Sequence, residues 1–163
     1  MQLTVAELVR YTGEERVRWE KWFRENGDHL LKMPLTGDRE KTIGALILHI
    51  FGPELRFVQR IRGEPLTEYR ERPSRTVEEV FGFGIETRQA LNAFLAGAKA
   101  DDWSRVVDFP ISGRGNCRAT VRKAILHSLI HEIRHWAQIS RIMRERGFAP
   151  PGEHDLLWSA ALE

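Results

Sequence analysis

The chain has 163 residues, of which 42% are hydrophobic and 29% are charged, a balance typical of a folded globular protein. The 25 lysine and arginine residues and 23 aspartate and glutamate residues leave a net charge of +2, and the two signs alternate along the sequence. A nucleic-acid-binding protein normally has a concentrated basic surface, so we expect no nucleic-acid partner. The length predicts one domain covering residues 1–163.

The number of cysteines and the hydropathy of the sequence indicate where in the cell the protein is located. Cys117 is the only cysteine, so no internal disulfide can form. The first residues, MQLTVAELVRY, lack the basic and then apolar run of a signal peptide, and no segment has the roughly 20 apolar residues of a membrane span. These features predict a cytoplasmic protein without a membrane partner.

The first two helices are predicted from their periodicity and their end signals. Thr4 and Glu7 have the spacing of a capping box, and Gly27 suits a helix end, which predicts a helix over about residues 4–26. A second helix is predicted over about residues 39–62, and its strongly apolar sequence indicates burial.

Two further helices follow. Thr76 and Glu79 form a second capping box before a helix that reaches about residue 96. A β-like run at residues 106–109, then Pro110 and a turn signal at residues 113–115, predict a small hairpin. The last helix covers about residues 119–146 and ends at Gly147. The predicted fold is all-α: an antiparallel four-helix bundle with a small hairpin before the last long helix.

The last helix contains the stretch LHSLIHEIRHWAQI, with His127, His131 and His135 at intervals of four residues. Two imidazole groups at this spacing on a helix can bind one metal ion. All three cannot do so, because His127 and His135 lie about 12 Å apart along the helix axis. Nitrogens on one ion lie within about 4 Å of each other. One of the three therefore has another role.

A helical histidine pair needs a further ligand from elsewhere in the fold. His49 is the candidate, because it lies in the apolar run LILHIFG of the second helix. A buried histidine alone is more often a hydrogen-bonded core residue, but helix bundles build metal sites from side chains on facing helices. Three neutral imidazoles with an open position are typical of a reactive site. His29 and His154 are predicted to lie on the surface.

HEIRH also matches the H-E-x-x-H motif of metallopeptidases, in which the glutamate is a general base. The extended form of that motif requires glycine and histidine where this chain has Gln138 and Arg141. Glu145 or Glu153 could supply a later ligand but is poorly placed. Glu132 is predicted to be a solvated surface charge or a partner of a ligand, so a peptidase is a remote alternative.

The chain resembles the DinB/YfiT-like superfamily of four-helix-bundle proteins, which bind a divalent metal through three histidines. TIGALILHIFGPELRFVQRI is similar to the second helix of that family and HSLIHEIRHWAQISRIMRERGFAPP to its last long helix. The resemblance implies that His49, His131 and His135 are the metal ligands and that His127 is not. Gln138 matches a family glutamine. Trp136-Ala137 replaces the usual Arg-Gly, and Gly52-Pro53 falls inside the second helix.

Several superfamily members use low-molecular-weight thiols such as bacillithiol or mycothiol, as S-transferases or as an isomerase. The resemblance therefore implies a metal-dependent enzyme, a thiol transferase or a hydrolase, with a small-molecule substrate and a homodimeric state. Imidazole ligands suit zinc and nickel, which are the expected metals. The alternative is a non-catalytic metal-binding stress-response protein. Catalytic and cofactor-binding residues are not identified by the sequence. Arg56 and Arg60 could face an acidic cofactor, but arginine is mostly exposed, which favours solvated side chains.

Overall fold

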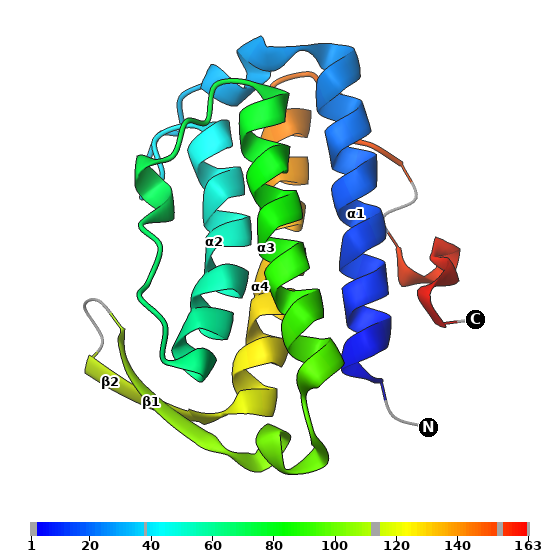
Figure 1. The fold of residues 1–163 in the computed structure, drawn as a ribbon. Coiled ribbons are helices and arrows are strands. Elements are labelled where there is room, and N and C mark those ends of the chain that lie inside the picture. The colour runs from blue at the N-terminus through cyan, green and yellow to red at the C-terminus, as the bar shows by residue number, and fades with distance from the viewer. Residues whose placement is uncertain (1–2, 38, 112–114, 153–154, 163) are drawn as a thin grey trace.

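Four helices dominate the computed structural model, which describes residues 3–37, 39–111, 115–152 and 155–162 (Figure 1). They are α1 (Val5–Asn26), α2 (Ile43–Arg62), α3 (Val77–Gly97) and α4 (Val121–Glu145). Each follows a threonine whose hydroxyl accepts a hydrogen bond from a backbone N–H of the first turn. Such N-caps satisfy donors that the helix leaves unpaired, so the sequence itself fixes where each helix begins.

The predicted four-helix bundle is confirmed, and the structure adds how its helices are connected. Residues 63–76, here called the crossover segment, return along the length of the bundle between α2 and α3 (Figure 1). Consequently α2 and α3 run in the same direction, and both run opposite to α1 and α4. Helix α2 continues through Pro53 without a break.

The predicted hairpin is also present. Strand β1 (Val106–Ile111) pairs with β2 (Gly115–Thr120) in antiparallel register, with Phe109 opposite Cys117. Its turn signal falls partly at residues 112–114, outside the described residues. The last helix begins two residues later than expected, because Ala119 belongs to β2. The hairpin closes the end of the bundle at which α3 ends and α4 begins (Figure 1).

A layer of charged side chains divides the core into two apolar clusters. One cluster is built around Trp19, Phe51 and Trp136, and the other around Leu91 and Ile125 nearer the hairpin. Four charged residues, one from each helix, form this layer: Arg16 on α1, Glu54 on α2, Arg88 on α3 and Glu132 on α4. Ion pairs within this layer tie all four helices together.

The C-terminal segment contacts the bundle through small residues. Arg10 donates a hydrogen bond to the carbonyl of Ala161, and Ser159 donates one to Glu14. Leu157 remains 90% exposed. No helix in the described ranges is both long enough and apolar enough to cross a membrane.

Candidate metal centre and its pocket

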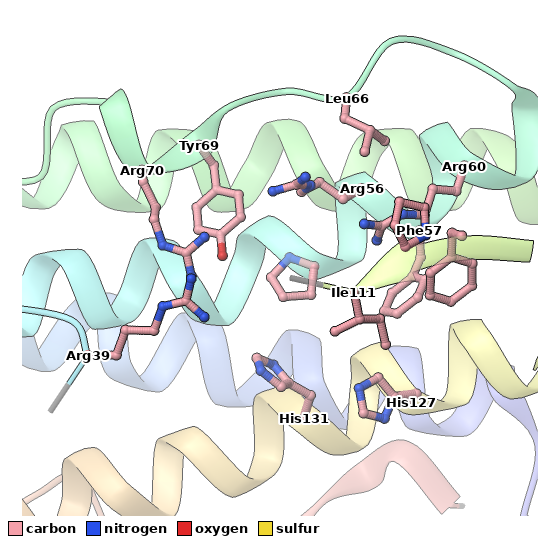
Figure 2. Close-up of a pocket in the computed structure, with 13 residues that line it drawn as sticks. Arg39, Arg56, Phe57, Arg60, Leu66, Tyr69, Arg70, Ile111, His127 and His131 are labelled. Atoms are coloured by element: carbon pink, nitrogen blue, oxygen red, sulfur yellow. The ribbon is translucent and has the colours of Figure 1, made fainter. Parts of the chain in front are cut away.

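A pocket of about 450 Å³ opens between α2, the crossover segment, the hairpin and α4 (Figure 2). His127 and His131 reach into it from α4, and arginine side chains face them from α2 and the crossover segment. The hairpin contributes an apolar wall that includes Phe109 and Ile111. The volume is in the range of small-molecule sites in proteins.

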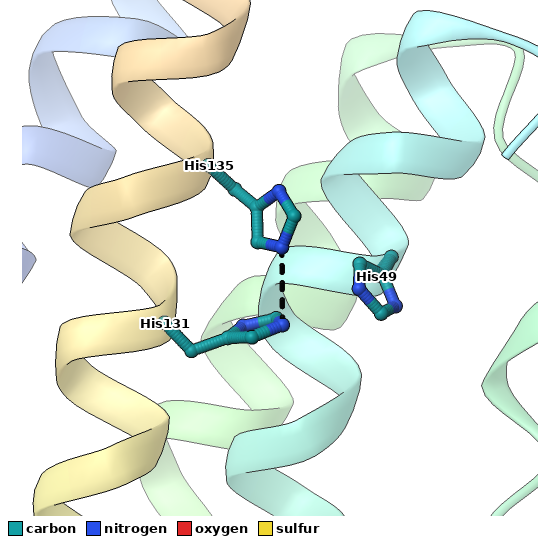
Figure 3. A group of neighbouring side chains, drawn as sticks. All are labelled: His49, His131 and His135. Carbon is teal, nitrogen blue, oxygen red and sulfur yellow. Dashed lines mark hydrogen bonds between the residues drawn. The ribbon is translucent and has the colours of Figure 1, made fainter. Parts of the chain in front are cut away.

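At this pocket the structure brings together the three histidines predicted as ligands. His131 and His135 project from α4 toward His49 on α2 (Figure 3). One ring nitrogen from each residue lies within 4.8 Å of the others, so the group could hold a metal ion. The Nε2 atoms of His131 and His135 are 3.1 Å apart. His127 is not in this group, and its ring packs edge-on against Phe57 instead.

Hydrogen bonds on the far side of the His135 ring determine which of its nitrogens is available. Nδ1 of His135 lies 2.7 Å from the amide oxygen of Gln138, which can only accept, so Nδ1 carries the proton. The lone pair of its Nε2 therefore faces Nε2 of His131. Nδ1 of His131 is buried and has no hydrogen-bond partner among the described residues. The two Nε2 atoms are close enough for a cation or a shared proton to lie between them, so the group fits a metal ion.

His49 has a corresponding set of partners. Its Nδ1 lies 3.0 Å from the Tyr69 hydroxyl and 3.6 Å from a carboxylate oxygen of the buried Glu40. Arg70 binds the same carboxylate at 2.9 Å and holds it in place. Nη2 of Arg70 is also 3.4 Å from Nδ1, so all three partners lie on the Nδ1 side of the ring and the other nitrogen is left for a metal.

The surroundings also keep the ligands in the neutral form that binds metals. Burial lowers the pKa of His49 to about 4, although Glu40 acts in the opposite direction. Burial and then the neighbouring His135 lower the pKa of His131 to about 3. Both rings are therefore uncharged near pH 7, and neither must lose a proton before it can bind a cation.

The prediction that Glu132 is a solvated surface charge is wrong. Its side chain is 1% exposed, and its carboxylate accepts hydrogen bonds from Nε and Nη2 of Arg16 at 2.8 and 2.6 Å. Arg88 and the indole N–H of Trp136 lie at 3.4 and 3.2 Å. Adjacent residues on a helix point about 100° apart, so Glu132 faces the core while His131 faces the pocket. The glutamate of HEIRH is thus committed to the charged layer, where it cannot act as a base at the histidine group.

Trp136, which stands where the family has arginine, is a core residue. Its ring stacks on Trp19 at 5.2 Å and on Phe81 at 6.3 Å, so it does not close the pocket. Arg56 and Arg60, expected to be solvated, are partly exposed: both line the pocket, and the Nε atom of each is buried. His29 is exposed as predicted, and His154 lies outside the described residues.

Three residues around His49 were missed: Glu40, Tyr69 and Arg70. They lie outside the long helices: Glu40 comes shortly before α2, and Tyr69 and Arg70 belong to the crossover segment that runs along it. One sequence signal was available for Tyr69. A Cβ at Gly52 would lie 2.3 Å from the Tyr69 ring, and an isolated glycine inside a helix often marks such a close approach.

The fold and the site together define a helical-bundle protein whose potential metal ligands come from two facing helices. The DinB superfamily profile matches residues 34–139, a range that contains all three histidines. The chain therefore belongs to the DinB superfamily. A DinB-like protein from Bacillus cereus ATCC 10987 has a similar crystal structure, with a TM-score of 0.62 and 20% sequence identity over 85% of this chain and 90% of that one. Comparison with curated proteins finds no match.

Proposed function

We propose that His49, His131 and His135 hold one divalent metal ion and that the protein is a metal-dependent enzyme. The observation that carries the proposal is the approach of three imidazole nitrogens to within 4.8 Å of one another, beside a pocket that His131 lines. Imidazole ligands suit zinc and nickel, and these are the metals that we expect.

The reaction class that fits such a centre is activation of a thiol or a water molecule. A divalent metal with three neutral protein ligands and an open position supplies Lewis acidity that lowers the pKa of a bound thiol or water. Tyr69 and Glu40 orient the His49 ring, and Gln138 orients that of His135. The pocket beside His131 gives a small substrate access to the group.

Within this class we favour transfer of a low-molecular-weight thiol, such as bacillithiol or mycothiol, to an electrophile. This choice comes from the superfamily, in which several members use such thiols. A homodimeric state accompanies the proposal on the same grounds, whereas a single domain and a cytoplasmic location follow from the chain length and from the single cysteine.

Two observations weigh against the alternatives. A non-catalytic metal protein would favour an enclosed site with a fourth protein ligand. Among the described residues, the group consists of three histidines only, and one of them borders an open pocket. A peptidase would need Glu132 beside the metal, but its carboxylate is paired with Arg16 in the charged layer.

The test is a conjugation assay on protein loaded with zinc or nickel. Bacillithiol or mycothiol is mixed with the electrophilic dye monochlorobimane, and thiol-conjugate formation is followed above the uncatalysed rate. We expect metal-dependent catalysis that is lost in His131→Ala and retained in His29→Ala, which alters an exposed histidine. A metal-loaded protein that accelerates conjugation of neither thiol would contradict the transferase proposal.

A further inference from the structure

The pocket beside the histidine group has an unbalanced charge. Its lining includes four arginines and no acidic residue: Arg39, Arg56, Arg60 and Arg70. Arg70 already has a partner, because Glu40 binds it at 2.9 Å. Arg56 is 4.0 Å from the half-exposed carboxylate of Glu68, at the limit of an ion pair. Arg60 has no ion pair with any of the described residues.

The side chains of Arg56 and Arg60 are only partly exposed, and both line the pocket. The guanidinium of Arg60 lies 4.7 Å from the centre of the Phe109 ring and 5.5 Å from that of Phe57. The Nε atoms of both arginines are buried and have no hydrogen-bond partner among the described residues. Burial, and then the neighbouring Arg56, lower the pKa of Arg60.

Such an arrangement is unfavourable without a ligand. Two neighbouring guanidinium groups repel each other. An oxyanion between them would compensate both charges through the outer guanidinium nitrogens, because the planar guanidinium group matches carboxylate and phosphate oxygens. The apolar wall of the hairpin gives the uncharged part of a ligand a surface to cover.

We infer that the pocket binds a small organic oxyanion, a carboxylate or a phosphate monoester. Its charged group contacts Arg56 and Arg60, and its apolar part lies against Phe109 and Ile111 on the side of His131. The inference gives the class of substrate or cosubstrate of the proposed enzyme and rests on the proposed function for that role. Anion binding itself requires only the arginines.

The experiment measures binding to metal-free and metal-loaded protein by isothermal titration calorimetry. Phenyl phosphate and phenylacetate are the anionic probes, and phenylacetamide is the neutral probe of similar shape. We expect an anion to bind the metal-free protein more tightly than phenylacetamide does, and the tighter of the two anions indicates whether the natural group is a phosphate or a carboxylate.

Variants of the two arginines then test whether the anion binds between them. Loss of a charged hydrogen-bonding partner should weaken anion binding at least about tenfold in Arg60→Gln and in Arg56→Gln. Arg60→Lys, which keeps the charge, should retain more affinity than Arg60→Gln. The matched control is Arg118→Gln on β2, whose side chain is 76% exposed and which should bind as the wild type does. Thermal unfolding of each variant identifies any that fail to fold. If Arg60→Gln fails, the anion affinity of Arg60→Lys is compared with that of Arg118→Gln in its place.

Equal affinity for the anionic and neutral probes, or equal anion affinity in Arg60→Gln and Arg118→Gln, would overturn the inference. The two proposals fail separately. If the protein binds metal but shows no arginine-dependent anion binding, only the anion-site proposal is contradicted. If it shows arginine-dependent anion binding but takes up no metal, only the proposal of a metal-dependent enzyme is contradicted.

Discussion

The hydroxyl group of Tyr69 lies 3.0 Å from Nδ1 of His49, although the two residues come from different segments of the chain. The crossover segment carries Tyr69 along α2, and the absence of a side chain at Gly52 lets its ring lie against the helix. Tyr69 therefore orients the candidate ligand His49 without being one of the three histidines that could hold the metal.

Tyr69→Phe should weaken metal binding with little change in the fold. The variant keeps the ring but removes the hydroxyl at His49, and loss of such a partner of a ligand typically lowers metal affinity about tenfold or more. Competition with a chelating dye measures the affinity. Tyr11→Phe is the control, since it removes the hydroxyl of the other tyrosine, on α1, far from the histidine group. Equal affinity in the two variants would mean that Tyr69 does not orient His49.

Gly52→Ala should reduce both stability and metal affinity. The new Cβ would meet the Tyr69 ring at 2.3 Å, and overpacking of this kind costs about 1–3 kcal/mol. Gly82→Ala is the matched control inside α3, where a Cβ would meet nothing within 4 Å. That change should stabilise the helix by about 0.5–1 kcal/mol. Urea unfolding distinguishes the two variants, and a Gly52→Ala protein as stable as the wild type would contradict the close packing.

Glu132→Gln should be strongly destabilising. The substitution removes one of two carboxylates that compensate Arg16 and Arg88 in the charged layer, and breaking a buried ion pair costs about 3–5 kcal/mol. Glu145→Gln, which alters an exposed pair with Arg141 on the same helix, should change stability by less than about 1 kcal/mol. A Glu132→Gln protein that is as stable as the wild type but inactive would instead indicate a general base.

Stability of the metal-free protein should fall as the pH decreases from 7 toward 4. Unfolded histidine has a pKa near 6.5, whereas the folded values are about 4 for His49 and about 3 for His131. Below pH 6.5 the unfolded chain therefore binds protons that the folded protein does not, which favours unfolding. The charged and titratable groups around the two rings are Arg39, Glu40, Tyr69, Arg70, His127, Arg134 and His135.

Urea unfolding of the metal-free protein at pH 7.5 and pH 5 measures this effect. His131→Gln should lose less stability between the two pH values than the wild type, because one of the two groups with a lowered pKa is gone. His29→Gln, at an exposed position, should lose as much as the wild type. An identical pH dependence in His131→Gln would show that His131 does not have the lowered pKa.

Local sequence signals predicted most of the bundle. Capping boxes and terminal glycines are local signals, so most helix ends agree to within about two residues, whereas α2 begins four residues later than predicted, after its cap Thr42. The histidine pair was visible because i, i+4 spacing is a local property, and His49 because it interrupts an apolar run. The burial of Glu132 was not visible, since its partner Arg16 is 116 residues away and only the packing of α1 against α4 brings them together. Tyr69 and Glu40 depend in the same way on the paths of irregular segments.

Elemental analysis of protein purified without a metal-affinity tag shows whether His49, His131 and His135 bind one metal ion. The proteins to compare are the wild type, His49→Ala and His127→Ala. We predict one zinc or nickel ion per chain in the wild type and in His127→Ala, and loss of the ion in His49→Ala. Metal retained in His49→Ala, or no metal in the wild type even after zinc or nickel is added, would contradict the account.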